Sequence, residues 1–244
     1  MAANWKMYKT AAETRAFFEK FSPLVAASGH CEILVCTPYL SVDAAVEAAR
    51  GTRVQVGAQN LYWKKEGAFT GEVSAPMIRA AGCTHVLVGH SERRQFFGET
   101  DESVSAKAAA ALDAGLAPVV CVGERVEERQ SGNTDAVLKE QFQKGIGPLS
   151  EEQFSRILIA YEPVWAIGTG LVATPDQAAD AHRTIREEAR ARYGAAAADQ
   201  VRILYGGSVK PDNIKGLMAR TGIDGALVGG ASLDPFAFAS IVNF

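Results

Sequence analysis

The stretch from Ile157 to Gln177 reads ILIAYEPVWAIGTGLVATPDQ and decides the fold. It opens with the apolar run Ile157 to Tyr161, which is typical of a parallel strand covered on both faces. A loop follows, and Thr174, Pro175 and Gln177 then supply an N-cap, a proline in the first helical turn and a capping-box glutamine. The stretch predicts a strand, a loop and a helix in succession, the repeating unit of α/β proteins.

The same alternation runs along the whole chain. Apolar runs recur, each followed by a turn and a segment with helical spacing. With the short run before Asn4 included, such units fit eightfold into 244 residues, at about 30 residues each. This predicts a single (β/α)8 barrel domain over residues 1–244 with a truncated first strand, while periodicity alone leaves an open doubly wound sheet as the alternative. The remaining strands are expected at Glu32 to Cys36, Val54 to Ala58, His85 to Val88, Pro118 to Val122, Val201 to Tyr205 and Ala226 to Val228.

Composition narrows the class of protein. Hydrophobic residues make up 48% and charged residues 22%, as in globular proteins. The net charge of −3 argues against a nucleic-acid partner, because such a surface needs clustered Lys and Arg. No signal-peptide pattern and no run of about 18 apolar residues appears, so we expect a cytoplasmic protein without a membrane partner. We expect reduced thiols in or near the core and no metal site, because no C-x-x-C pair occurs among Cys31, Cys36, Cys83 and Cys121.

In a barrel of this type, functional residues gather where strands end and loops begin. His90 follows the strand His85 to Val88, separated from it by a single glycine. If a helix starts at Ser91, its N-terminus disfavours the imidazolium, and neutral His90 would donate a hydrogen bond toward a developing oxyanion. A histidine with a purely structural role is the alternative for this loop alone.

Glu162 ends the apolar strand Ile157 to Tyr161. Pro163 holds it extended, and its apolar neighbours are expected to raise its pKa into the range of a general base. A solvated glutamate at a strand end is the alternative. Ile167 lies farther along the same loop and is predicted to form the apolar tip of a lid.

The lid also contains the pattern G-x-G-x-x-A, from Gly168 to Ala173, which is typical of dinucleotide binding. We reject that interpretation, because such glycines follow the strand at once and open the helix. Here five residues separate Glu162 from Gly168, and the helix is predicted to open near Thr174.

Two glycine-rich turns follow the last two predicted strands. One contains Gly206, Gly207 and Ser208, and the other contains Gly229 and Gly230. Glycines let backbone N–H groups approach phosphate oxygens, and these two loops commonly form the phosphate site of such barrels. Either turn alone would be an ordinary tight turn, but the pair predicts a phosphate cradle.

Taken together, four motifs resemble the triosephosphate isomerase family over essentially the whole chain. The resemblance implies a (β/α)8 barrel that interconverts dihydroxyacetone phosphate and glyceraldehyde 3-phosphate through an enediolate, with no metal or organic cofactor. The motifs are Asn4-Trp5-Lys6, Gly89 to Arg94, Ala160 to Gly170 and the two glycine turns.

The resemblance also implies roles for single residues. Glu162 would carry the proton, His90 and Asn4 would bind the substrate oxygens, Lys6 would supply positive charge, and Glu92 would lie in the polar shell beside His90. The phosphate would be bound by backbone N–H groups of Gly168, Ser208, Gly229 and Gly230. The lid would comprise Pro163, Val164, Trp165, Ala166, Ile167, Gly168, Thr169, Gly170, Leu171, Val172 and Ala173.

A homodimer is implied as well. The segment from Gln59 to Glu72 is long, and its tip, Gly67 to Gly71, is apolar enough to be buried in a partner. By resemblance, Thr70 would reach the partner's site near Asn4 and Lys6. A surface loop packed on its own subunit is the alternative.

Two departures from the family pattern bear on this interpretation. Only three residues precede Asn4, which puts barrel closure in question and leaves open a non-catalytic or impaired sugar-phosphate-binding barrel. Leu171 stands where the lid often carries lysine.

Rival enzymes fit less well, because the strand Ile157 to Tyr161 lacks the lysine of a Schiff-base aldolase. A metal-dependent epimerase would need shared ligand spacing among His30, His85, His90 and His182, which is not found.

Overall fold

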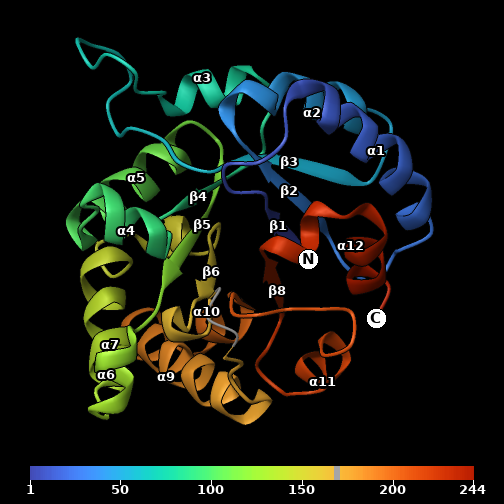
Figure 1. The fold of residues 1–244 in the computed structure, drawn as a ribbon. Coiled ribbons are helices and arrows are strands. Elements are labelled where there is room, and N and C mark those ends of the chain that lie inside the picture. The colour runs from blue at the N-terminus through green and yellow to red at the C-terminus, as the bar shows by residue number, and fades with distance from the viewer. Residues whose placement is uncertain (168–170) are drawn as a thin grey trace.

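A computed structural model describes residues 1–167 and 171–244 of the chain. Within these residues the strands form one closed parallel barrel in the order β1 to β8, surrounded by helices (Figure 1). The predicted barrel is confirmed, and the open sheet is excluded. The strands are β1 Ala2–Asn4, β2 Ile33–Thr37, β3 Val54–Ala58, β4 His85–Val88, β5 Ala117–Val122, β6 Leu158–Tyr161, β7 Arg202–Tyr205 and β8 Gly225–Val228.

Strand β1 closes the barrel despite its short length. Its residues pair with β2 from Ala2 opposite Leu34 to Asn4 opposite Cys36. On the other side, Ala2 and Ala3 pair with residues of β8. The concern that a truncated first strand would fail to close the barrel is therefore not borne out.

Aromatic packing holds the start of the chain in place. The buried Trp5 contacts Phe17 edge-on with ring centroids 4.8 Å apart, and its Nε1 donates to the carbonyl oxygen of Ser232 at 3.1 Å. Phe21 of helix α1 (Ala11–Val25) stacks on Phe238 of α12 (Pro235–Val242), with ring centroids 5.0 Å apart. These contacts fix the residues after β1 against the loop after β8, where the predicted phosphate turn begins.

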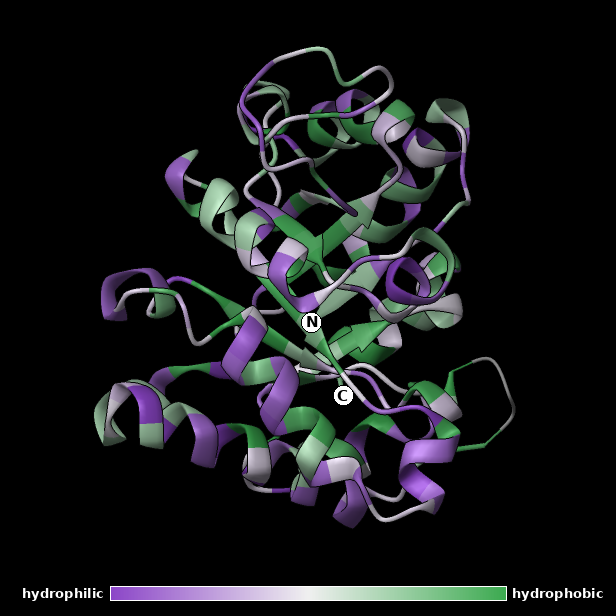
Figure 2. Cartoon of the chain, turned by 90° about the vertical axis from the view of Figure 1, so that its left-hand side faces the viewer, coloured by the Kyte–Doolittle hydropathy of each residue, from purple (hydrophilic) through white to green (hydrophobic). Residues whose placement is uncertain are grey.

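The helices form the outer layer, and the strands they cover are apolar (Figure 2). A second apolar cluster, which includes Leu87, Val119 and Leu204, fills the inside of the barrel. The inside of the barrel is therefore a packed core and not a pore. The remaining helices are α2 Val42–Ala49, α3 Ala75–Ala80, α4 Ser91–Phe97, α5 Asp101–Asp113, α6 Val126–Gln130, α7 Thr134–Gly145, α8 Glu151–Phe154, α9 Pro175–Tyr193, α10 Ala195–Gln200 and α11 Ile214–Met218, with 3-10 turns η1 Tyr39–Ser41, η2 Val164–Ala166 and η3 Gly230–Leu233.

The cysteines are free thiols, as predicted. Cys36, Cys83 and Cys121 are buried, and Cys31 is partly buried. In the described part of the chain, no helix is long and apolar enough to cross a bilayer.

His182 packs against Tyr161, the last residue of β6. It is fully buried in α9, its Nδ1 lies 2.9 Å from the carbonyl oxygen of Gly222, and its ring meets that of Tyr161 edge-on with centroids 5.8 Å apart. Its Nε2 has no hydrogen-bond partner among the described residues. Burial outweighs the Gly222 contact and lowers the pKa of His182 to about 4. Burial likewise lowers the pKa of His85 to about 4.

We predict that the free energy of unfolding falls as the pH falls from about 6.5 toward 4. In this window the unfolded chain binds protons that the two buried imidazoles do not, so protonation favours unfolding. Each histidine should account for roughly 1–3 kcal/mol. His182→Asn, which keeps a donor for Gly222, should flatten the slope, whereas the exposed His30→Asn should not. Urea unfolding at several pH values measures the slope, and an unchanged slope in His182→Asn would contradict the prediction.

Candidate active site

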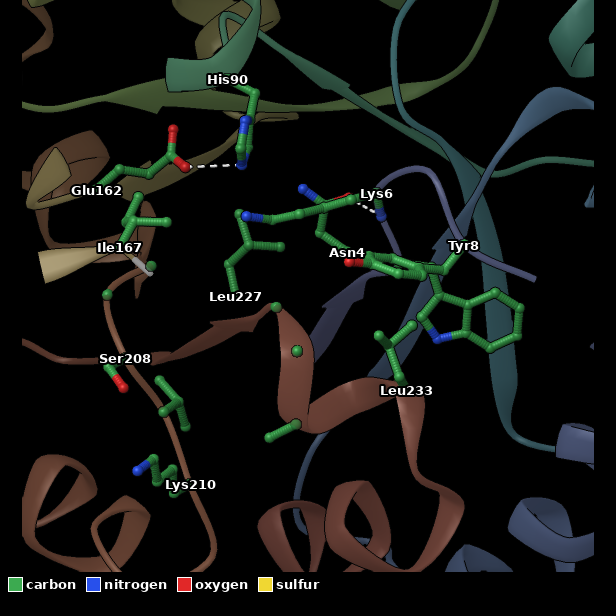
Figure 3. Close-up of a pocket in the computed structure, with 17 residues that line it drawn as sticks. Asn4, Lys6, Tyr8, His90, Glu162, Ile167, Ser208, Lys210, Leu227 and Leu233 are labelled. Atoms are coloured by element: carbon green, nitrogen blue, oxygen red, sulfur yellow. Dashed lines mark hydrogen bonds and ion pairs between the residues drawn. The ribbon is translucent and has the colours of Figure 1, made fainter. Parts of the chain in front are cut away.

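The carboxyl ends of the strands meet at one mouth of the barrel, as expected for a parallel closed sheet. A cavity of about 390 Å³ opens there. Figure 3 shows Glu162 and His90 on one side of this cavity, with the Lys6 side chain extending toward them and Ser208 and Lys210 farther away. Its walls include Asn4, Lys6, His90, Glu162, Ile167, Ser208, Gly229 and Gly230. The predicted catalytic and phosphate-binding residues within the described ranges therefore converge on one site apart from Glu92, whereas Thr70 and the described lid residues other than Ile167 do not line it.

Glu162 lies directly after β6 and is 2% exposed. Its Oε2 accepts a hydrogen bond from the backbone N–H of Ser91 at 3.0 Å, and its Oε1 lies 2.9 Å from His90 Nε2. The hydroxyl of Ser91 also donates to Oε1 at 3.3 Å. The carboxylate is thus held by the first turn of α4, which follows β4, two strands away from β6 around the barrel.

Because of these partners, the pKa of Glu162 is shifted in the opposite direction to the one predicted. Burial alone would raise this pKa, as expected from the apolar neighbours. However, His90, the Ser91 amide and Lys6 together outweigh burial, and the pKa of Glu162 is lowered. The prediction of a raised pKa is therefore wrong for this arrangement, in which the carboxylate stays ionised.

His90 is the N-cap residue of α4 and is buried. Its Nδ1 accepts the backbone N–H of Glu92 at 3.2 Å, so we assign the ring proton that faces Glu162 to Nε2. Burial lowers the pKa of His90, but the carboxylates of Glu162 and Glu92 outweigh it and raise the pKa overall. The expected preference for the neutral ring is therefore opposed by Glu162, although the Nε2 donor predicted for this loop is present.

Asn4 and Lys6 enter the cavity from the end of β1. The backbone of Lys6 lies in the left-handed region with φ 53°, a conformation that costs a non-glycine residue about 1–3 kcal/mol. Two hydrogen bonds hold it there, since Asn4 Oδ1 accepts the Lys6 N–H at 3.0 Å and Gln59 Nε2 donates to the Lys6 carbonyl at 2.9 Å. Lys6 Nζ forms an ion pair with Glu92 at 2.5 Å. Glu92 therefore lies beside both Lys6 and His90, although it is not a wall of this cavity.

The two glycine turns form another part of the wall. Gly207 requires glycine for steric reasons, because a Cβ there would lie 2.2 Å from the Tyr205 hydroxyl oxygen. Gly229 and Gly230 differ, since among the described atoms a Cβ would meet nothing nearer than 3.6 Å at the first and nothing within 4 Å at the second. Packing within the protein therefore does not explain glycine at these two positions.

The predicted lid, from Pro163 to Ala173, is only partly described. Its first residues form η2, Ile167 lines the cavity, and Leu171 and Val172 are exposed at 54% and 51%. The predicted lid positions Gly168, Thr169 and Gly170, and with them the predicted phosphate contact of Gly168, lie outside the described residues.

Sequence reasoning did not identify some residues that support the site. Glu124 is fully buried and accepts hydrogen bonds from Trp165 Nε1 at 2.9 Å and from the Tyr161 hydroxyl at 3.1 Å. Burial outweighs these contacts and raises the pKa of Glu124. For Gln59, the sequence predicts only that a loop begins there. Both act through contacts between distant segments, for which the sequence carries no local signal.

No group of three or more His, Cys, Asp or Glu side chains is placed to hold a metal ion in the ranges 1–167 and 171–244.

Comparisons with known proteins agree over the full length. The family model described as triosephosphate isomerase matches residues 1–244. The chain is 65% identical to the triosephosphate isomerase of Solibacter usitatus (strain Ellin6076) over 244 residues, which are 100% of this chain and 98% of the relative. It is 52% identical to that of Citrifermentans bemidjiense, over 100% of this chain and 97% of the relative. The crystal structure of triosephosphate isomerase from Bartonella henselae superimposes with a TM-score of 0.90 at 37% identity, covering 100% and 97% of the two chains.

We predict that His90→Ala raises the pKa of Glu162. The substitution removes the hydrogen-bond donor that faces the carboxylate, while the burial of the carboxylate remains. The ¹³C chemical shift of the Glu162 carboxyl carbon, followed from neutral to acidic pH, measures this pKa. Ser91→Ala keeps the backbone N–H and should shift the pKa less. An unchanged or lower pKa in His90→Ala would show that the imidazole does not stabilise the carboxylate.

Proposed function

The chain belongs to the triosephosphate isomerase family, and we propose that Glu162 is the base with which it moves a proton between adjacent substrate carbons. The protein is an isomerase that interconverts dihydroxyacetone phosphate and glyceraldehyde 3-phosphate. The identity over the full length supports this activity and not the alternative of a non-catalytic sugar-phosphate binder. The observation that carries the proposed mechanism is the hydrogen-bonded pair Glu162 and His90 in the same cavity as both glycine turns.

The proposed reaction has two proton transfers between Glu162 and carbon. Glu162 turns from Ser91 toward the substrate, removes a proton from C1 of dihydroxyacetone phosphate and leaves an enediolate. The hydroxyl proton on the C1 oxygen passes to the C2 oxygen, and Glu162 returns a proton to C2, which yields glyceraldehyde 3-phosphate. The lowered pKa of Glu162 keeps the base ionised before substrate binds, and closure of the barrel mouth would remove water from it. These steps need no metal or organic cofactor, since the carboxylate and fixed donors supply the chemistry.

Charge that develops on the substrate oxygens needs donors fixed in advance. We assign this role to His90 Nε2 and Asn4, with Lys6 supplying positive charge to the anionic substrate and intermediate. The strained backbone of Lys6 supports this assignment, because it is stabilised by two side-chain hydrogen bonds instead of being relaxed by glycine. Glu92 would orient Lys6 through their ion pair.

The phosphate group would be bound by backbone N–H groups of Ser208, Gly229 and Gly230, and of Gly168 in the lid. The space next to Gly229 and Gly230 supports this, because glycine there leaves room that no side chain of residues 1–167 or 171–244 occupies. Lys210 lines the same cavity and adds positive charge. The lid, from Pro163 to Ala173, would cover the substrate, with Ile167 as the apolar contact.

A homodimer would complete the site. The loop between β3 and α3 projects from the barrel (Figure 1), and residues 63–72 are exposed, including Phe69 at 39%. A second cavity of about 270 Å³, lined by Asn4, Lys6 and the exposed Phe97, lies beside the catalytic cavity. We propose that Thr70 from the tip of the partner's loop enters this cavity and contacts Asn4 and Lys6.

Residues 1–244 would function as one catalytic domain. The free cysteines fit a location in the reducing cytoplasm.

We expect Glu162→Gln to lower turnover about 10²- to 10⁴-fold while substrate binding changes little, because a positioned base contributes about that much. The assay incubates dihydroxyacetone phosphate with the protein in deuterated water and follows deuterium at C2 of glyceraldehyde 3-phosphate by NMR. Glu19→Gln, an exposed carboxylate on α1, should behave like the unchanged protein. Wild-type turnover in Glu162→Gln would overturn the role of the base.

We expect Phe69→Glu to prevent dimer formation and to lower turnover roughly tenfold or more, because the site would lose contacts that hold its donors in position. Sedimentation velocity measures the association, and turnover is measured at the same protein concentration. The matched control is Phe236→Glu on α12, a residue 58% exposed on another side of the barrel. A fully active monomer would refute the shared site.

A further inference from the structure

Gln141 of α7 makes two hydrogen bonds to the backbone of a single residue. Its Oε1 accepts the N–H of Gly123 at 2.8 Å, and its Nε2 donates to the carbonyl oxygen of Gly123 at 3.0 Å. Gly123 is buried and directly follows β5, where the pairing with β6 ends. The glutamine amide thus replaces the strand neighbour that this peptide segment lacks.

Gly123 in turn contacts the backbone of Glu162. A Cβ at Gly123 would lie 1.7 Å from the carbonyl oxygen of Glu162 and 3.2 Å from its Cα. Two further hydrogen bonds join the same segments, from Glu162 N to the Val122 carbonyl at 2.8 Å and from Val164 N to the Glu124 carbonyl at 3.1 Å. The backbone of residues 162–164 is therefore supported along its length by residues 122–124.

We infer that Gln141 is a positioning residue for Glu162, which it holds in place through the backbone of Gly123. This inference rests on the proposed role of Glu162 as the base. The side chain of Gln141 does not line the cavity that holds Glu162 and His90, so it acts without touching the substrate. Shifting a reacting group by about 1 Å can lower turnover about 10²-fold, so the support matters to the reaction even though it lies outside the cavity.

The amide is the side chain that this position requires. Leucine would leave both backbone groups of Gly123 without a partner in a buried position. A glutamate would keep the acceptor, but its ionised carboxylate would face the carbonyl oxygen of Gly123 without a proton to donate. When protonated, the same glutamate would restore both hydrogen bonds.

The test compares Gln141→Leu and Gln141→Glu with the unchanged protein. We expect Gln141→Leu to lower kcat roughly 10- to 100-fold, with KM and the inhibition constant of inorganic phosphate within about twofold. Those two constants should hold because three of the four proposed phosphate contacts, Ser208, Gly229 and Gly230, lie in the loops after β7 and β8. In Gln141→Glu, kcat relative to the unchanged protein should be low near pH 8 and should rise as the pH falls.

Other charged groups near Gln141 are common to both proteins. Those that line the same groove are Glu92, Arg94, Glu99, Arg125, Glu127, Glu128 and Glu162 itself. The ratio of kcat in Gln141→Glu to kcat in the unchanged protein, followed over pH, therefore reports the titration of the carboxyl group introduced at position 141. Gln143→Glu is the matched control, because Gln143 lies on the same helix, is exposed and donates instead to Glu188 at 2.9 Å.

A ratio for Gln141→Glu that does not change with pH, or equal changes in kcat for Gln141→Glu and Gln143→Glu, would overturn the inference. If Gln141→Leu does not fold, the pH ratio of Gln141→Glu decides alone. Glu162→Gln separates the two levels of the argument. Turnover retained in Glu162→Gln would refute the proposed base, whereas its loss together with wild-type behaviour of both Gln141 variants would refute only the role of Gln141.

Discussion

Closure of the barrel by three residues is the constraint on which the site depends. The backbone hydrogen bonds of β1 join the two ends of the sheet, and they bring Asn4 and Lys6 next to the turn at Gly229. Trp5, between these two residues, is buried and bonded to Ser232, so closure and the position of the charged side chain are set together. A loss of pairing at this point would separate the cation from the remainder of the mouth.

The mouth of the barrel holds several charged groups that would be unfavourable singly. Glu162 is buried, yet it remains an anion because a helix N-terminus and an imidazole face it. Lys6 is balanced by Glu92 in the same way. Charges held in fixed pairs need little reorganisation when a substrate replaces one partner, which is the property expected of a preorganised site.

The fold, and the gathering of most candidate site residues around one cavity, could be predicted, because strand ends and glycine turns leave local patterns. Val54 to Ala58 and His85 to Val88 match the observed strands, whereas Glu32 lies outside β2, where its side chain forms an exposed ion pair with Arg202. The predicted direction of the Glu162 pKa shift is wrong, because the partners that lower this pKa include Ser91, which lies 71 residues earlier in the chain. Gln141 was also missed, since a glutamine on a helix has no sequence mark that shows which backbone it meets.

The left-handed backbone at Lys6 limits which residues selection for thermal stability can place at this position. Glycine, or asparagine to a lesser degree, adopts that conformation with less strain, so either would be favoured by selection for thermal tolerance alone. Each would also delete the ammonium group from the barrel mouth. Position 6 is therefore a place where selection for durability and selection for turnover oppose each other, and lineages adapting to higher temperature should find their gains elsewhere in the chain.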